Sequence, residues 1–271
     1  MQRTRRAAAA ALPLLVATLP VPESGAEMPA PDPAAFEIVD LTHTYDEDTV
    51  YWPTSPSAFE LTVLADGATE GGYHYRANRL CTPEHGGTHL DAPSHFAKEG
   101  LDAAGVPLRD LIGPAVVLDV TDEAAKDPDY RLTVERVEAF EARHGRIPRG
   151  AIVALRTGWS ARWPDAAAYL GDDTPGDASS LHFPSYGAEA ARLLVEARGV
   201  AVLGVDTASI DRGASEDFLV HRVAAAADVP GLENLTRLDR LPPVGAWIVA
   251  LPMKIAGGSG GPARVVALVP R

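Results

Sequence analysis

Residues 85–96 contain the densest group of metal-binding side chains in the sequence. They read His-Gly-Gly-Thr-His-Leu-Asp-Ala-Pro-Ser-His-Phe, so His85, His89, Asp91 and His95 fall within eleven residues. Neutral imidazoles with one carboxylate suit zinc, manganese or iron, and they leave coordination positions open for water and substrate. A lone buried histidine is usually a hydrogen-bonded core residue, and an aspartate near a proline is usually a turn former. Four such residues so closely spaced favour a metal site over these separate structural roles.

The local sequence also predicts how this segment positions its side chains. The glycines after His85 disfavour a helix, so we expect a turn that leads into an extended segment. In an extended segment His89 and Asp91 point to the same side, while Leu90 faces the core. Pro93 then bends the chain, which allows His95 to return to the same centre.

The composition limits what kind of site this is. The chain has 271 residues and a mass of 28.6 kDa, which suits one large domain or two small ones. Its formal net charge of −13 argues against nucleic-acid binding, because an acidic surface repels phosphate. The single cysteine, Cys81, excludes a disulfide framework within the chain and any metal site that needs several thiolates. Histidine and carboxylate side chains must therefore bind any metal, and we expect Cys81 to be a buried neighbour of the site.

Residues 1–26 have the pattern of a bacterial export signal. Three arginines open the chain, an uncharged apolar run covers residues 7–19, and small residues stand at 24–26, which predicts cleavage near Ala26. The apolar run is too short to span a bilayer, and the alternative for it is an ordered N-terminal helix. Cleavage would remove three Arg and one Glu, a net charge of +2, so the mature chain would carry −15. The protein is expected to be periplasmic or secreted, and the pattern leaves open whether export follows the general or the twin-arginine route.

The rest of the chain predicts a Pro/Ala-rich linker over 27–35 and one domain over 36–271. Helices are expected at 133–144, where Thr133 offers an N-cap, at 187–198 and at 218–227. Apolar or alternating runs predict strands at 36–41, 59–64, 73–80, 114–120, 151–156, 199–205, 245–251 and 263–269. The glycine-rich segment 257–261 follows no phosphate-loop pattern and is interpreted as a hairpin or a loop near a site. These elements predict a single α/β domain with a mixed β-sheet and flanking helices.

The segment 85–96 resembles the signature of the cyclase-type metal-dependent hydrolases, a family that includes bacterial kynurenine formamidase and isatin hydrolase. The resemblance covers most of residues 36–269. It extends to blocks at 40–43, 52–53, 111–115, 157–159, 204–211, 221, 233–235 and 251–262. It implies a swivelling β/β/α fold, a divalent metal cofactor (Mn²⁺ or Zn²⁺) and a homodimer.

The resemblance also implies roles for particular residues. His85, His89 and Asp91 would bind the catalytic metal. His95, His221 and Glu233 would complete a second metal position, or act as catalytic base and supporting residues where one metal binds. Without the resemblance, His221 and Glu233 would pass as an ordinary helix histidine and a glutamate before a loop. The other four histidines, His43, His74, His144 and His182, receive no role in the site.

This ligand set predicts hydrolysis. A bound metal lowers the pKa of water from about 15.7 toward 7 and polarises a carbonyl, so that hydroxide can attack an amide. Glu233 or His95 would then carry the proton to the leaving nitrogen. Side chains that could contact an aromatic substrate are Tyr51, Trp52, Phe59, Ser215 and Lys254, although strand aromatics are more often core and a loop lysine is as often only solvated.

The block from Asp206 to Ser215, the extra length at 172–182 and the loop around Lys254 are most similar to the isatin-hydrolase branch. The predicted reaction is therefore ring-opening hydrolysis of a cyclic amide such as isatin, which gives isatinate. One alternative is an arylformamidase that acts on N-formylkynurenine. Another, from a different class, is a non-catalytic periplasmic metal- or solute-binding protein.

Overall fold

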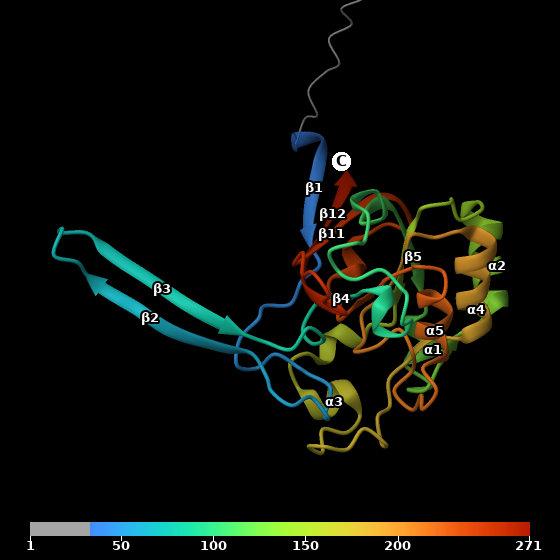
Figure 1. The fold of residues 1–271 in the computed structure, drawn as a ribbon. Helices are drawn as coiled ribbons and strands as arrows, with labels where there is room; N and C mark the ends of the chain where they lie inside the picture. Colours follow the sequence, from blue (N-terminus) through green and yellow to red (C-terminus); the bar gives the residue numbers. More distant parts are fainter. Residues whose placement is uncertain (1–32) are drawn as a thin grey trace, which may run out of the picture. The chain divides into compact units, whose positions relative to one another are not determined.

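The computed structural model describes residues 33–271, and Ala34–Arg271 form one compact unit (Figure 1). The predicted export signal, and all of the predicted linker except its last three residues, lie outside the described residues. Those three residues, Pro33–Ala35, form the 3₁₀ turn η1. Among the described helices, none is long and apolar enough to cross a bilayer.

Seven strands form a closed barrel, which positions the segment that holds His89 and Asp91. Their order is β12-β11-β5-β7-β9-β10-β4, and β4 pairs back onto β12. The pairings within the run β5-β7-β9-β10 are parallel. All other pairings around the barrel are antiparallel. The barrel strands are β4 (His89–Asp91), β5 (Ile112–Asp119), β7 (Ile152–Arg156), β9 (Val202–Val205), β10 (Gly231–Glu233), β11 (Val244–Pro252) and β12 (Gly260–Pro270). An eighth strand, β1 (Phe36–Asp40), pairs with β12.

The predicted α/β domain with a mixed sheet is confirmed, but its closure into a barrel was not predicted. Closure depends on β4 and β10, which have only three residues each and carry too little pattern to be recognised. The swivelling β/β/α description stays a prediction.

Two hydrophobic clusters account for the long apolar runs of β5, β7 and β9, which are buried on both faces. One cluster fills the barrel interior and includes Leu90, Val117, Ile152, Leu232, Ile248 and Val265. The other lies between the outer face of the same strands and a layer of helices, and includes Val153, Leu203, Val137, Leu194 and Val220. The helices of that layer are α2 (Val134–His144), α4 (Ala188–Arg192), its π-helical continuation η5 (Leu193–Arg198) and α5 (Leu219–Ala225).

The helix boundaries follow the predicted signals. The Thr133 side chain accepts a hydrogen bond from the N–H of Arg136, and Gly145 ends α2. Gly199 ends the η5 segment in the left-handed conformation that glycine adopts without strain. Short elements complete the chain: α1 (Thr121–Ala124), α3 (Ala166–Leu170), the parallel pair β6 (Arg131–Leu132) and β8 (Ser185–Tyr186), and the 3₁₀ turns η2 (Pro93–His95), η3 (Leu108–Asp110), η4 (Trp159–Arg162) and η6 (Leu238–Arg240).

A long antiparallel hairpin extends away from the barrel (Figure 1, cyan). It consists of β2 (Glu60–Ala68) and β3 (His74–Cys81), which form a sheet of their own. We call residues 60–81 the arm. Cys81, expected to be buried beside the site, is exposed at the end of β3, so that prediction is wrong. Cys81 is close to His85 in sequence, but it lies at the end of β3, which is not a strand of the barrel.

Candidate metal centre

Strand β4 presents His89 and Asp91 on one side and Leu90 on the other, as the alternation predicts. Both polar residues are buried, at 2% and 4% exposure, and Leu90 is fully buried in the barrel interior. Glu233 joins them because β10 pairs with β4 in a register that places it directly opposite His89. Gly260 on β12 lies opposite Asp91 and leaves room for His85, since a Cβ atom there would stand 2.7 Å from the His85 ring.

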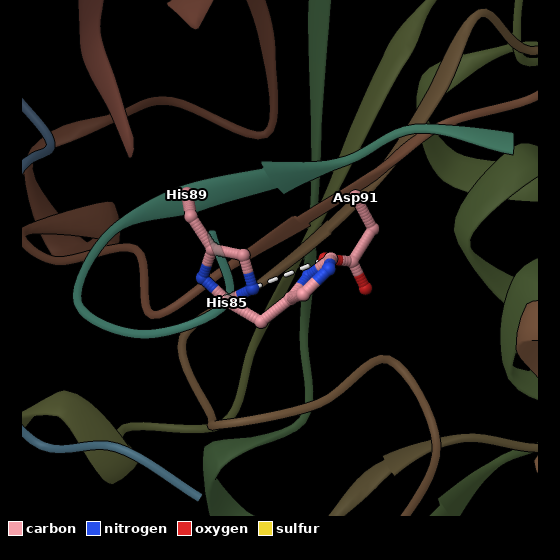
Figure 2. A group of neighbouring side chains, drawn as sticks. All are labelled: His85, His89 and Asp91. Carbon is pink, nitrogen blue, oxygen red and sulfur yellow. Dashed lines mark hydrogen bonds and ion pairs between the residues drawn. The ribbon is translucent and has the colours of Figure 1, made fainter. Parts of the chain in front are cut away.

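His85 reaches the same centre from the loop before β4 (Figure 2). Its Nδ1 lies 2.6 Å from Asp91 Oδ1, and its Nε2 lies 2.8 Å from the hydroxyl of Ser259. That hydroxyl donates its proton to Glu84, 2.6 Å away, so it accepts from His85 Nε2. In the neutral ring Nδ1 then carries no proton and turns its lone pair toward a carboxylate oxygen. Ser259 belongs to the glycine-rich segment 257–261, which is therefore a loop beside the site, as predicted.

His89 and His221 are fixed in the same way by their outer nitrogens. His89 Nδ1 donates to the carbonyl of Gly87 at 2.9 Å, and His221 Nδ1 donates to Asp211 Oδ2 at 2.7 Å. The inner nitrogen of each neutral ring is then unprotonated and faces carboxylates. His89 Nε2 lies 3.1 Å from Asp91 and 3.5 Å from Glu233, and His221 Nε2 lies 3.0 Å and 3.1 Å from the same two residues.

Asp91 connects two groups of ligand atoms, each within 4.8 Å. One consists of His85, His89 and Asp91, and the other of Asp91, His221 and Glu233. Asp91 Oδ1 faces the first group and Oδ2 faces His221. Such a set of imidazole nitrogens and carboxylate oxygens fits one divalent cation, or two that share Asp91.

A buried ring nitrogen without a hydrogen-bond partner supports a cation at this site. His89 Nε2 is buried and has no hydrogen-bond partner among the described residues, although Asp91 Oδ1 is near. A buried nitrogen without a partner is costly. A cation between the lone pairs of the imidazoles and the carboxylates satisfies both.

When no cation is bound, protons on the histidines supply the positive charge that faces the carboxylates. Burial by itself would lower the pKa of His89, but the nearby carboxylates of Asp91 and Glu233 outweigh it and raise the pKa to about 9. For His221, burial is likewise outweighed by the hydrogen bonds to Asp211, Asp91 and Glu233, which raise its pKa well above the usual value. Burial would raise the pKa of Asp91, but the surrounding histidines hold it well below its usual range.

We therefore expect metal binding to release protons. At pH 6–8 the metal-free protein carries a proton on His89 that a metal must displace, so affinity should rise about tenfold per pH unit, and up to a hundredfold where His221 also gives up a proton. The rise should level off above the His89 pKa of about 9. Calorimetric titration with Mn²⁺ or Zn²⁺ in two buffers of different ionisation enthalpy counts the protons directly. An affinity that does not change between pH 6 and pH 8 would contradict this.

Asn234 helps to fix the tautomer of His89, because both side chains bond to the carbonyl of Gly87. Its Nδ2 donates to the carbonyl of Gly87 at 2.7 Å, and its Oδ1 accepts from the hydroxyl of Tyr169 at 2.9 Å. The same Gly87 carbonyl accepts the His89 Nδ1 proton. Asn234 also has a φ of +55°, a conformation that asparagine tolerates better than most residues. It is a positioning residue that acts on His89 through Gly87.

Asn234→Ala should weaken metal affinity by about 10- to 100-fold, the usual effect of losing a residue that orients a ligand histidine. Tyr169→Phe is the matched control, because it removes the hydrogen bond at the other end of Asn234 and leaves the bond to Gly87 intact. That variant should lower thermal stability while its metal affinity stays within about threefold of the parent. Equal losses of affinity in the two variants would show that Asn234 only stabilises the fold.

A cavity of about 360 Å³ opens onto both ligand groups. Tyr51, Trp52, Phe96 and Phe218 line it together with the ligand residues, so four aromatic rings form part of its wall. The rings of Phe96 and Phe218 have their centroids 5.3 Å apart. This wall suits a flat apolar ligand whose polar group meets the cluster.

The structure brings most of the predicted site residues together. His85, His89, Asp91, His221 and Glu233 form the two ligand groups, and Tyr51 and Trp52 line the cavity beside them. His95 also lines the cavity but belongs to neither ligand group, and its ring stacks on His85 with a centroid distance of 3.8 Å.

Three predicted substrate contacts are not among the described residues that line the cavity. Phe59 packs near Tyr45, Lys254 is exposed, and the Ser215 hydroxyl accepts from the N–H of Phe218. Ser215 therefore contacts Phe218, a residue of the cavity wall, and does not line the cavity itself. Direct roles for these three residues stay predictions.

Sequence reasoning missed four contributors: Asp211, Asn234, Phe96 and Phe218. Asp211 accepts hydrogen bonds from the backbone N–H groups of Val220 and His221, in the first turn of α5, and from His221 Nδ1. It therefore fixes both the helix and its histidine. The block 204–211 contained Asp211, but nothing in its spacing tied it to a residue ten positions later. The four histidines without a predicted role belong to neither ligand group; His43, for example, stacks on Trp163.

Known proteins are similar to this chain along most of its length. A model of the family described as "Putative cyclase" matches residues 39–212. The isatin hydrolase of Roseibium aggregatum is 32% identical, over 87% of this chain and 92% of that protein. The kynurenine formamidase of Salinibacter ruber is 28% identical, over 84% of this chain and 96% of that protein.

Among solved structures, isatin hydrolase A from Labrenzia aggregata bound to benzyl benzoate superposes with a TM-score of 0.80. It is 35% identical, over 88% of this chain and 95% of that one. The chain therefore belongs to the cyclase family of metal-dependent hydrolases, as the signature at residues 85–96 predicts.

Proposed function

We propose that this protein hydrolyses the carbon–nitrogen amide bond of a small aromatic cyclic amide, with isatin as substrate and isatinate as product. The observation that carries the proposal is the position of the ligand cluster at one end of an aromatic cavity. There, ring nitrogens of His85, His89 and His221 converge on Asp91, and those of His89 and His221 also face Glu233. The isatin hydrolases among the relatives, and the aromatic ester bound in one of them, support the substrate class.

His85, His89 and Asp91 would hold the catalytic cation, and Asp91, His221 and Glu233 would hold a second one where two bind. The donor set suits Mn²⁺ and Zn²⁺. The cation would supply a water of lowered pKa and would polarise the amide carbonyl. The aromatic wall would orient the planar substrate with its carbonyl toward the cluster.

Two groups can move the proton. Glu233 Oε1 is held by the N–H of Ile210 at 2.8 Å and by His221, so its Oε2 is the freer oxygen on the cavity side. His95 faces the cavity without a side-chain hydrogen bond to the described residues. One of them would take the proton from the attacking water and deliver it to the amide nitrogen as the ring opens.

The direct test gives metal-loaded full-length protein isatin and, separately, N-formylkynurenine, and follows the absorbance of each. Turnover of isatin that EDTA abolishes and Mn²⁺ or Zn²⁺ restores is the expected result. Turnover of N-formylkynurenine alone would favour the arylformamidase, which the Salinibacter relative supports. Turnover of neither would contradict both reactions.

The localisation is part of the same proposal. An export signal over residues 1–26 would place the enzyme in the periplasm or outside the cell, which disfavours the arylformamidase, because tryptophan breakdown is normally cytoplasmic. A non-catalytic metal- or solute-binding protein would require a closed coordination sphere, whereas this cluster opens onto a cavity. Glu233→Gln separates that alternative from catalysis, because only catalysis needs a group that moves the proton.

A further inference from the structure

The glycine-rich segment 257–261 lies against His85, the ligand residue that enters the cluster from a loop rather than from a strand or a helix. Ser259 is the last residue before β12, and its carbonyl accepts a hydrogen bond from the N–H of Ala92 at 2.8 Å. This bond ties the segment to the chain directly after β4, the strand that carries His89 and Asp91. The segment is therefore part of the framework of the site.

Two glycines allow the segment to approach the site this closely. A Cβ atom on Gly258 would stand 2.7 Å from Glu84 Oε1, and one on Gly260 would stand 2.7 Å from the His85 ring. Cβ atoms do not come this close to other heavy atoms, so a side chain at either position would displace its neighbour. Gly258 and Gly260 flank Ser259, and together they allow its hydroxyl to lie between Glu84 and His85.

Hydrogen bonds connect Glu84, Ser259 and His85 in a row, which we call the relay. The N–H and the hydroxyl of Ser259 both donate to Glu84 Oε2, at 2.9 Å and 2.6 Å. His85 Nε2 lies 2.8 Å from the same hydroxyl oxygen. Glu84 Oε2 itself is 4.0 Å from His85 Nε2, which is too far for a hydrogen bond. The carboxylate therefore contacts the ring only through Ser259.

Glu84 decides which way the Ser259 hydroxyl points. A serine hydroxyl by itself does not select a histidine tautomer, because it can donate to a ring nitrogen or accept from one. An ionised carboxylate can only accept. Glu84 therefore takes the hydroxyl proton and leaves the Ser259 oxygen as an acceptor for a proton on His85 Nε2. The other ring nitrogen, Nδ1, then keeps its lone pair on the side of Asp91, 2.6 Å from Oδ1.

His85 needs such a selecting group more than the other two ligand histidines do. The outer nitrogens of His89 and His221 face the carbonyl of Gly87 and the carboxylate of Asp211, which accept and do not donate. The outer partner of His85 is a hydroxyl, which can do both. The His85 side chain is also 27% exposed, against 3% for His89 and 7% for His221, so water competes for its outer nitrogen.

We propose that Glu84 and Ser259 are positioning residues of the metal centre, which select Nδ1 of His85 as the atom that binds the cation. The inference rests on the metal-dependent hydrolysis proposed above. It concerns two residues that belong to neither ligand group and are not among the described residues that line the cavity. Both act through His85, and residues that orient a ligand histidine usually contribute about 10- to 100-fold to metal affinity.

The test is a double-mutant cycle on the affinity of the full-length protein for Zn²⁺ and Mn²⁺, measured without substrate by competition with a chelator. Ser259→Ala removes the acceptor of the Nε2 proton, and Glu84→Gln allows Ser259 to donate to that nitrogen instead. Each variant should weaken metal affinity by about 10- to 100-fold. The double variant should lose no more affinity than the more affected single variant, because Glu84 acts through Ser259.

Asp102→Ala is the matched control for the glycine-rich segment. Asp102 accepts hydrogen bonds from the N–H groups of Gly105 and Gly257, at 2.7 Å and 2.6 Å, so it anchors the segment away from His85. Its replacement should lower thermal stability while metal affinity stays within about threefold of the parent. An equal loss of affinity in Asp102→Ala would show that Glu84 and Ser259 only support the segment, and would overturn the proposal.

Long-range ¹H–¹⁵N NMR spectra of the Zn²⁺-loaded protein give a readout that a loss of stability alone would not move. The His85 Nε2 proton should give a signal protected from exchange with water in the parent, and this protection should be lost in Ser259→Ala. A proton on Nδ1 in the parent would overturn the proposal, as would full affinity in both single variants. Losses that multiply in the double variant would show that Glu84 acts by its charge alone and would overturn the relay. A parent that binds neither ion would overturn the metal centre together with the relay, whereas binding without turnover would overturn only the proposed reaction.

Discussion

Asp91→Asn is expected to remove metal from both ligand groups and to lower turnover by at least about 10³-fold. Asp91 is the one residue that both groups share, with Oδ1 facing His85 and His89 and Oδ2 facing His221. Asparagine keeps the shape but replaces one oxygen by an NH₂ group, which cannot bind a cation. It also removes the negative charge that holds the positive ion in a buried site.

The measurements are metal content by elemental analysis and initial rates with the preferred substrate. Asp206→Asn is a matched control, since Asp206 is an equally buried carboxylate that belongs to neither ligand group. It accepts hydrogen bonds from Thr157 and Gly158, so its replacement should lower the melting temperature but leave metal per folded molecule unchanged. If Asp91→Asn retains full metal and activity, the cluster is not the metal centre.

The local sequence pattern was enough to predict the part of the site that is contiguous in sequence. The period-two alternation of a strand placed His89 and Asp91 on one side and Leu90 in the core, and the structure confirms this in β4. The same is true of α2, where the Thr133 cap and the Gly145 stop are local signals. These features depend on a few neighbouring residues, which a single sequence displays.

The parts that depend on distant residues could not be predicted from pattern. Glu233 meets His89 only because β10 pairs with β4 across the barrel closure, and Ser259 meets His85 across 174 positions. Their types and spacing carry no trace of that pairing, so Glu233 came from the family resemblance and Ser259 only from its place in a glycine-rich loop. The prediction that Cys81 is buried failed for the same reason. Whether a strand joins the barrel or leaves it as an arm is decided by tertiary contacts.

Glu233→Gln is expected to lower kcat by about 10²- to 10⁴-fold while the group formed by His85, His89 and Asp91 keeps its metal. Glutamine preserves the hydrogen bond that Oε1 accepts from the N–H of Ile210, so the side chain stays in place. What is lost is the negative charge and the ability of Oε2 to accept a proton at the cavity. KM should change little, because the aromatic wall that binds the substrate is untouched.

Metal analysis of the same variant separates the two roles of Glu233. Retention of all the metal with loss of turnover identifies Glu233 as the proton carrier of a one-metal site. Loss of half the metal together with turnover identifies it as a ligand of a second cation, in the group with Asp91 and His221. Asp206→Asn again controls for loss of a buried carboxylate, since Asp206 lies outside both groups. Unchanged turnover in Glu233→Gln would leave His95, which faces the same cavity, as the proton carrier and would rule out catalysis by Glu233.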